Sequence, residues 1–262
     1  MNIDLRLGDC LEVMKTIEDN SIDMVLCDLP YGTTSNKWDS VIDLDKLWFE
    51  YKRVIKINGP IILFADQPFT TNLISSNLKM WRYNFVWDKE VRTGFLNAKK
   101  MPLKQTEDIC VFYKKLPTYN PIMTDAKKEN IRHNFKDCSV SSNYQNKKGM
   151  HSKDYDGTKR YPVNIIKHNR KQKECHPRKI LHPTQKPVGI LEYLIKTYSN
   201  ENELVLDNTM GVGSTAIACI NTNRNFIGIE LNEDFYNLAK KRVEEKKEEK
   251  DNEQQTLFKA LN

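Results

Sequence analysis

An acidic turn near the N-terminus carries side chains suited to holding a planar base. Asp28-Leu29-Pro30-Tyr31 follows the apolar run from Ile22 to Cys27, which has the length and composition of a buried strand. The turn presents a carboxylate, a backbone carbonyl fixed before a proline and an aromatic face. These groups can stack on a base and accept hydrogen bonds from its exocyclic amine. Taken alone, the four residues are explained equally well as a strand that ends in a Pro-Tyr turn.

A second acidic turn lies far along the chain. A short buried strand ends in Asp207, the following turn contains Gly211 and Gly213, and the next strand ends in Glu230. Strand, Gly-x-Gly turn, helix, strand and terminal acid form the arrangement of dinucleotide folds. The glycines let the backbone approach a ligand, the helix start offers free N–H groups, and the acid can accept hydrogen bonds from ribose hydroxyls. This segment predicts a site for an adenosine-type ligand.

The elements that must position the two turns alternate between strand and helix. Hydrophobic periodicity predicts strands at 4–8, 22–28, 60–65, 83–88, 109–113, 204–207 and 225–230, and helices at 9–17, 43–57, 68–78, 188–199, 214–221 and 234–251. Such alternation predicts a parallel sheet, in which ligands bind beyond the carboxyl ends of the strands. Residues 89–104 are expected to form a polar, basic loop, long enough to suggest a function.

Composition narrows the class of protein. The chain has no apolar run long enough to cross a membrane and no leader-like start, so we expect a cytoplasmic protein. Its six cysteines are scattered, with no Cys-x-x-Cys pair and no close Cys/His cluster, which indicates reduced thiols and no metal site.

Positive charge is concentrated in one segment. Residues 116–181 carry 15 Lys and Arg against 6 Asp and Glu, a local net charge of +9, whereas the whole chain is at +6 and the remainder therefore at −3. Aromatic residues are interleaved with these charges, a mixture suited to phosphate contact and base stacking. The alternative is a disordered linker. The candidate DNA-binding residues, here and in the basic loop, are Lys99, Lys100, Lys147, Lys148, Arg160 and Arg170.

The order of the motifs resembles one family. Gly8-Asp9-Cys10, Asp28–Tyr31, a basic insertion, His182-Pro183-Thr184-Gln185-Lys186-Pro187 and Asp207–Thr215 resemble the β-class amino DNA methyltransferases. The resemblance implies an α/β fold with a doubly wound, mostly parallel, Rossmann-like sheet that is circularly permuted. It also implies a catalytic half at 1–115, a target-recognition region at 116–181, a cofactor-binding half at 182–250 and a tail at 251–262.

The resemblance also implies site residues and a cofactor. Asp28-Leu29-Pro30-Tyr31 is similar to the family's catalytic Asp-Pro-Pro-Tyr motif, with Leu29 in place of the first proline. The cofactor motif departs from the family's pattern at Asn208, Thr209 and Ser214. S-adenosylmethionine is the implied cofactor, and its expected contacts are Asp9, Cys10, Asp28, Thr184, Lys186, Asp207, Gly211, Gly213, Ser214, Thr215 and Glu230.

The expected reaction is direct methyl transfer to adenine N6 in duplex DNA after base flipping. Cytosine N4 stays open, although those enzymes commonly have serine where Asp28 stands. Methylation at cytosine C5 needs a cysteine, usually after proline, and the chain has no Pro-Cys pair. An RNA adenine methyltransferase fits the permuted order less well, and a nicotinamide dehydrogenase would leave Asp28–Tyr31 without a role. From a different class, a catalytically silent DNA-binding protein would need no cofactor.

Two further expectations concern partners. Gln254–Phe258 resembles the Gln-x-x-Leu-Phe peptide by which bacterial replication proteins dock on the sliding clamp. The end of an amphipathic tail is the alternative interpretation. The chain is expected to act on double-stranded DNA as a monomer or a homodimer.

Overall fold

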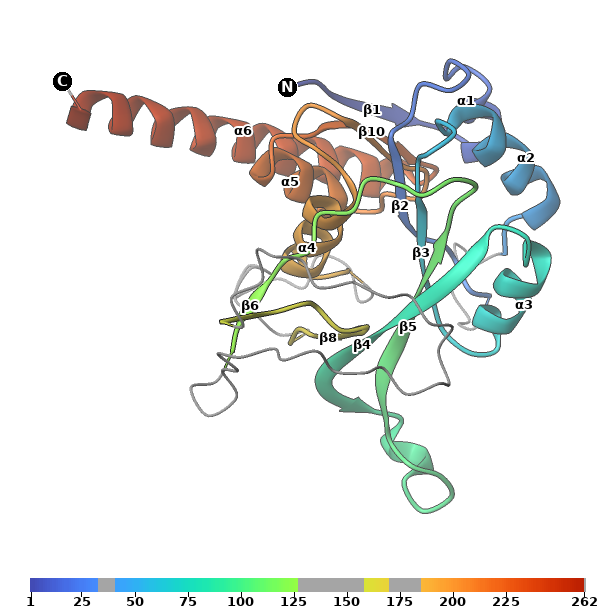
Figure 1. The fold of residues 1–262 in the computed structure, drawn as a ribbon. Helices are drawn as coiled ribbons and strands as arrows, with labels where there is room; N and C mark the ends of the chain where they lie inside the picture. The colour runs from blue at the N-terminus through green and yellow to red at the C-terminus, as the bar shows by residue number, and fades with distance from the viewer. Residues whose placement is uncertain (33–40, 127–157, 170–184, 262) are drawn as a thin grey trace, which may run out of the picture. The chain divides into compact units, whose positions relative to one another are not determined.

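The chain forms a twisted eight-stranded sheet in the computed structural model, which describes residues 1–32, 41–126, 158–169 and 185–261, with side chains up to residue 256 (Figure 1). Two compact units are present, the main one at 1–120 and 164–262 and a second at 121–163. The strand order in the main unit is β1-β10-β9-β2-β3-β5-β4-β8.

Most neighbouring strands of this sheet are parallel. The parallel strands run from β1 through to β3, and β5 is antiparallel to both of its neighbours, β3 and β4. The bounds are β1 Ile3–Leu7, β2 Met24–Asp28, β3 Ile61–Ala65, β4 Trp81–Thr93, β5 Lys104–Phe112, β8 Ile165–Lys167, β9 Leu204–Asp207 and β10 Asn225–Glu230. The predicted α/β class with a mostly parallel sheet is confirmed.

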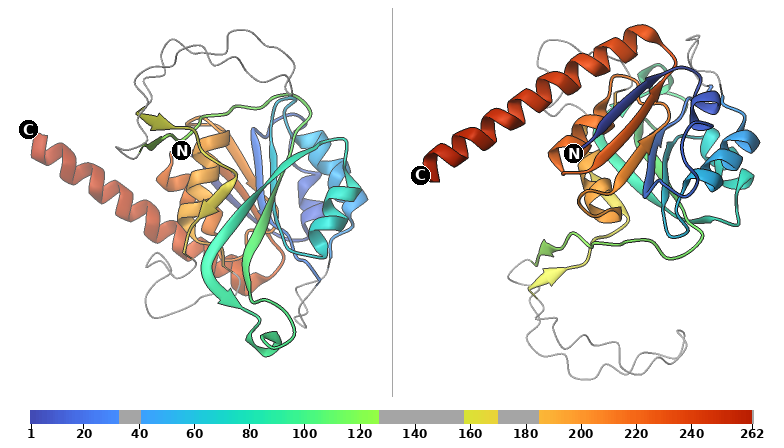
Figure 2. Two further views of the ribbon diagram at one scale, coloured as in Figure 1. Left: turned by 60° about the horizontal axis from the view of Figure 1, so that its bottom comes forward. Right: turned by 90° about the horizontal axis from the view of Figure 1, so that it is seen from above.

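Helices cover both faces of the sheet (Figure 2). One face carries α1 Cys10–Met14, α2 Leu44–Val54 and α3 Phe69–Ser76, and the other carries α4 Val188–Tyr198, α5 Ser214–Asn221 and α6 Glu233–Leu261. Strand β3, Ile-Ile-Leu-Phe-Ala, is buried along its whole length because helices lie on both sides. The two apolar clusters that result fix the carboxyl ends of β2 and β9 side by side.

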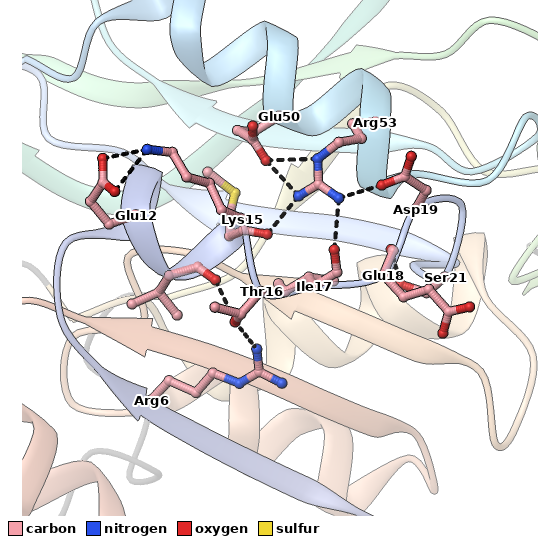
Figure 3. A network of polar contacts seen from close by, with 12 residues as sticks. Arg6, Glu12, Lys15, Thr16, Ile17, Glu18, Asp19, Ser21, Glu50 and Arg53 are labelled. Atoms are coloured by element: carbon pink, nitrogen blue, oxygen red, sulfur yellow. Dashed lines mark hydrogen bonds and ion pairs between the residues drawn. The ribbon is translucent and has the colours of Figure 1, made fainter.

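Arg53 ties helix α2 to the segment that leads into β2 (Figure 3). Its guanidinium donates to Glu50 and Asp19 at 2.6 and 2.5 Å and to the backbone carbonyls of Met14 and Ile17 at 2.6 and 2.7 Å. Those two carbonyls belong to the end of α1 and the turn after it, and the Met14 carbonyl also accepts the Ile17 N–H at 2.9 Å. The network therefore holds the approach to β2 in place.

Several element ends differ from the sequence-based predictions. The predicted loop at 89–104 was wrong at both ends, because β4 continues to Thr93 and β5 begins at Lys104. Cross-strand pairing extends these strands past the residues whose apolar pattern is clear. Helix α6 does not stop at Asp251 but runs through the predicted tail to Leu261, since neither Gly nor Pro interrupts it.

The predicted insertion is divided between the two units. Strand β8 pairs with β4 in the main sheet, whereas β6 Thr124–Asp125 and β7 Lys159–Arg160 pair with each other in the second unit. No helix in the described part of the chain is long and apolar enough to span a membrane.

Candidate active site

A cavity of about 760 Å³ opens at the carboxyl ends of β2 and β9. Residues of both acidic turns line it, namely Asp28–Tyr31 and all of Asp207–Thr215 except Gly213. They meet because β2 pairs in parallel with β9, so their last residues lie at one edge of the sheet. Residues 180 positions apart in the chain thus share one site.

Asp28 is held by two neighbours. One carboxylate oxygen accepts a hydrogen bond from the Tyr31 hydroxyl at 2.7 Å, and the other lies 2.8 Å from Lys186 Nζ. Its backbone carbonyl accepts a hydrogen bond from the Thr209 hydroxyl at 3.0 Å. Each carboxylate oxygen has two acceptor positions, so Asp28 retains capacity for another donor.

Lys186 belongs to a buried chain of alternating charges. Its ammonium lies 2.8 Å from Asp28 and 3.2 Å from Glu107, and Glu107 in turn lies 3.1 Å from Lys89. The side chains of Lys186, Glu107 and Lys89 are almost completely removed from solvent. Lys186 was predicted to contact the cofactor, and the structure places it beside Asp28 while it still lines the cavity.

The pKa values of the two acids in this chain of charges shift in opposite directions. Burial raises the pKa of Asp28 above its ordinary value, and Lys186 offsets only part of that effect. Burial also opposes the charge of Glu107, but the two lysines outweigh it and hold the pKa of Glu107 below its ordinary value. Lys186 loses solvation too, yet Asp28 and Glu107 raise its pKa, so it keeps its proton.

Aromatic rings enclose the space in front of Asp28. Tyr31 stacks on Phe69 with centroids 5.3 Å apart and an interplanar angle of 25°. Phe64 and Trp87 also line the cavity, and Lys186 Nζ lies 5.2 Å from the Phe64 centroid. Aromatic rings beside a hydrogen-bonding carboxylate suit a heterocyclic base.

The Asp207 turn forms another part of the cavity lining. Asp207 accepts hydrogen bonds from the Thr215 hydroxyl at 2.6 Å and the Thr209 N–H at 3.1 Å. Burial raises the pKa of Asp207 to about 7, despite these hydrogen bonds. Gly213 has a φ of 78°, and a Cβ there would lie 3.0 Å from that of Ala239 in α6. Only glycine fits this turn without strain.

The same turn has the groups expected of a nucleoside site. Glu230 accepts hydrogen bonds from the N–H groups of Gly211 and Asn232 at 2.9 and 2.8 Å, and burial raises its pKa. The Ser214 hydroxyl is buried in the cavity wall at the start of α5 and has no hydrogen-bond partner within the described residues. An unpartnered buried hydroxyl beside free helix N–H groups fits a polar ligand.

Asp9 and Cys10 also line the cavity. Asp9 caps α1 by accepting hydrogen bonds from the N–H groups of Leu11 and Glu12 at 2.8 and 3.3 Å. Burial raises the pKa of Cys10, which keeps this thiol neutral.

Asn208, a departure from the family's motif, has a structural role as a hydrogen-bond acceptor. It is buried, and its side-chain oxygen accepts hydrogen bonds from the Tyr51 hydroxyl at 2.5 Å and the Cys27 thiol at 2.9 Å. Asn208 therefore connects the cofactor turn to α2 and β2.

Other predicted residues lie elsewhere. Lys99 and Lys100 are exposed on the hairpin between β4 and β5, and Arg160 lies in β7 of the second unit. Thr184, Lys147, Lys148 and Arg170 are outside the described residues. Among the residues that the structure describes, no group of His, Cys, Asp and Glu could hold a metal ion.

Sequence reasoning missed Glu107, Lys89 and Trp87. Glu107 and Trp87 are paired directly across β4 and β5, and both line the cavity. The sequence signal that could have identified Glu107 is a charged residue in a strand whose later residues are fully buried. A buried charge of this kind needs a partner or a function.

Comparison with known proteins decides the family. A family model for amino DNA methyltransferases, described as DNA methylase, matches residues 22–241. The chain belongs to this N6/N4 DNA methylase family. Members of the DNA methylase family act on DNA, so the cavity between the two acidic turns is the candidate centre for N6 or N4 methylation.

Individual relatives can be aligned with most of this chain. The type II methyltransferase M.HpaI of Haemophilus parainfluenzae is 25% identical over 249 residues, which cover 90% of this chain and 73% of the relative. The DNA adenine methyltransferase YhdJ of Escherichia coli K12 is 25% identical over 254 residues, covering 90% and 81%. The crystal structure of the M1.HpyAVI complex with SAM superposes with a TM-score of 0.61 at 23% identity, covering 92% and 99%, and supports the fold.

Proposed function

We propose that this DNA methylase transfers a methyl group from S-adenosylmethionine to adenine N6 in duplex DNA. The observation that carries the proposal is the position of the Asp28 carboxylate in the same cavity as the Asp207 turn. An acid at this position favours adenine over cytosine N4. The relative YhdJ, a DNA adenine methyltransferase, is consistent with this choice.

The residues of the cavity fit the cofactor. Gly211 and Gly213 let the backbone approach the ligand closely, Ser214 and the start of α5 offer donors, and Glu230 can accept from ribose hydroxyls. When bound, S-adenosylmethionine supplies a methyl group on a sulfonium. The second wall, at Asp28–Tyr31, remains for the base.

The chemistry assigned to Asp28 is positioning of a weak nucleophile. The lone pair of an adenine amine is delocalised into the ring. If Asp28 and the Leu29 carbonyl accept its two N–H bonds, the nitrogen becomes more tetrahedral and its lone pair points out of the ring plane. Preorganised acceptors and correct orientation then provide most of the rate enhancement.

We expect base flipping because Asp28 lines a cavity. An amine within the base stack cannot reach Asp28, so the nucleotide must leave the duplex at a cost of a few kcal/mol. Tyr31, which stacks on Phe69, is the residue expected to stack on the base, and Lys186 is ion-paired with Asp28. We expect this activity in the bacterial cytoplasm.

The test is to identify the methylated nucleoside. Plasmid DNA is incubated with purified protein and S-adenosylmethionine, digested to nucleosides and analysed by mass spectrometry. N6-methyldeoxyadenosine supports the proposal, whereas N4-methyldeoxycytidine would transfer it to the alternative base. No modified nucleoside from a protein that binds the cofactor would contradict both and favour a silent DNA-binding protein.

Docking of Gln254–Phe258 on a sliding clamp stays a separate prediction. Gln254, Gln255 and Thr256 lie on an exposed part of α6. Deleting the last nine residues should abolish co-purification with the clamp. If the full chain does not bind the clamp, the prediction is wrong.

A further inference from the structure

The hairpin between β4 and β5 ends in an exposed apolar tip, which we define as residues 94–101. Among the described residues, Leu96 and Phe95 are the two most exposed large apolar side chains, at 100% and 81%, and Met101 on the same tip is 59% exposed. Single exposed apolar residues are ordinary, but a group of them on a projecting element marks an interaction site.

The tip is ordered by its own hydrogen bonds. Gly94 adopts a φ of 85°, and the following turn is closed by the N–H of Asn97 on the Gly94 carbonyl at 2.9 Å. Lys100 and Met101 donate to the Asn97 carbonyl at 2.8 and 3.0 Å. Phe95 and Leu96 are therefore presented outward by a fixed turn.

The sequence of the tip and its flanks contains basic residues and no acidic ones. Between Val91 and Thr106 the sequence has Arg92, Lys99, Lys100 and Lys104 but no acid. Lys104 is ion-paired with Asp66, whereas Arg92, Lys99 and Lys100 are exposed and have no ion-pair partner among the residues that the structure describes. An apolar tip flanked by free cations is complementary to a polyanion with apolar surfaces between its charges.

The sheet places this tip on the side of the active site. β4 runs in the same direction as β2 and β3, so it ends at the edge where Asp28 lies. Trp87 and Glu107 are opposite each other and line the cavity, and the strands continue to the pair of Thr93 and Lys104. A register shift lies between Asp88 and Thr93, and Glu107 and Lys104 are only three positions apart in β5, which corresponds to roughly 10 Å along that strand. This is a span of about three base-pair steps of duplex DNA. Figure 1 shows the hairpin extending beyond the sheet.

We propose that the hairpin tip binds the target duplex, with Phe95 and Leu96 inserted as an apolar wedge between bases and Arg92, Lys99 and Lys100 on the flanking phosphates. Phe and Leu are side chains that wedge into base steps and partly unstack them. Unstacking near the cavity would lower the cost of extruding the base that Asp28 receives. The inference rests on the DNA-directed function proposed above and adds the element that opens the duplex.

Paired variants separate the wedge from the charges. Phe95→Ser/Leu96→Ser should weaken binding to a fluorescein-labelled mixed-sequence duplex by about tenfold or more and leave the salt dependence unchanged. Lys99→Ala/Lys100→Ala should reduce the slope of log affinity against log salt by about 1.8. Phe49→Ser, which alters an exposed apolar residue on α2, is the matched control and should bind as the wild type does.

Permanganate reactivity of thymines reports unstacking directly. Wild-type protein should make thymines reactive in bound DNA, and the wedge variant should not, while both keep the same thermal stability and the same thermal shift with S-adenosylmethionine. Equal DNA affinity and equal thymine reactivity in wild type and wedge variant would overturn the inference. So would a wedge variant whose only change is loss of self-association in sedimentation.

These readouts are independent of methyl transfer. Tip-dependent DNA binding by a protein that methylates nothing would refute the proposed function and retain the wedge. Methylation by a protein whose tip is dispensable for DNA binding would retain the proposed function and refute the wedge.

Discussion

Glu107→Gln should destabilise the protein strongly, although glutamine has nearly the same size. Glu107 lies between Lys89 and Lys186, at 3.1 and 3.2 Å. Lys186 would keep Asp28 as a partner at 2.8 Å, but Lys89 is 4% exposed and would lose the carboxylate that faces it. The substitution thus leaves one buried ammonium without an opposite charge.

The size of the effect follows from this geometry. At 3.1 Å and an effective dielectric constant of 20, the attraction between unit charges is about 5 kcal/mol. Measured losses after removal of one partner from a buried pair are about 3–5 kcal/mol. Taking about 3 kcal/mol, and roughly 2–4 °C per kcal/mol in a chain of this size, the melting temperature should fall by about 6–12 °C.

The effect should depend on pH. Because the folded-state pKa of Glu107 is lowered, its contribution to stability is present above the unfolded-state pKa and is lost as pH falls through the folded-state value. Wild type and Glu107→Gln should therefore differ most at neutral pH and converge in acid.

Calorimetric unfolding at neutral pH and in acid is the assay. Lys89→Met/Glu107→Gln is the control, because it removes both charges of the pair and leaves neither one buried alone. It should recover at least half of the lost stability. The reasoning is refuted if Glu107→Gln lowers the melting temperature by less than about 2 °C, or if the double variant is as unstable as the sum of the single variants.

Three further substitutions test the Asp207 turn and the residues that support it. Because the pKa of Asp207 is raised to about 7, its ionisation destabilises the fold as pH rises, and Asp207→Asn should gain roughly 4 kcal/mol relative to wild type between pH 4 and 8 in urea unfolding. Gly213→Ala, with its positive φ and the close approach to Ala239, should cost about 1–2 kcal/mol and weaken S-adenosylmethionine binding in calorimetric titration. Tyr51→Phe removes a buried donor to Asn208 and should cost about 1–3 kcal/mol in the same unfolding assay, and an unchanged midpoint would contradict that hydrogen bond.

Local motifs predicted the two turns of the site well. Asp28 and Asp207 each end an apolar run, and strand length and turn chemistry are encoded by neighbouring residues. Their meeting could also be expected, because parallel strands bring their carboxyl ends to one edge. The structure adds that Lys186 lies on Asp28.

Register across antiparallel strands could not be predicted from the sequence. Glu107 reaches the cavity because β5 lies between β3 and β4, and its partner Lys89 comes from the far end of β4. No local pattern specifies that pairing. The end of α6 was missed for a different reason, since no Gly or Pro marks a stop between Asp251 and Leu261.

The most direct test of the central claim compares methyl transfer with cofactor binding in Asp28→Ala. Single-turnover transfer from radiolabelled S-adenosylmethionine to plasmid DNA is measured beside calorimetric titration of the cofactor, with Glu18→Ala, an exposed acid remote from the cavity, as the control. We predict that Asp28→Ala loses transfer while its cofactor affinity stays within about threefold of wild type and Glu18→Ala is unaffected. Transfer by Asp28→Ala at the wild-type rate would contradict the assignment of this carboxylate to the target amine.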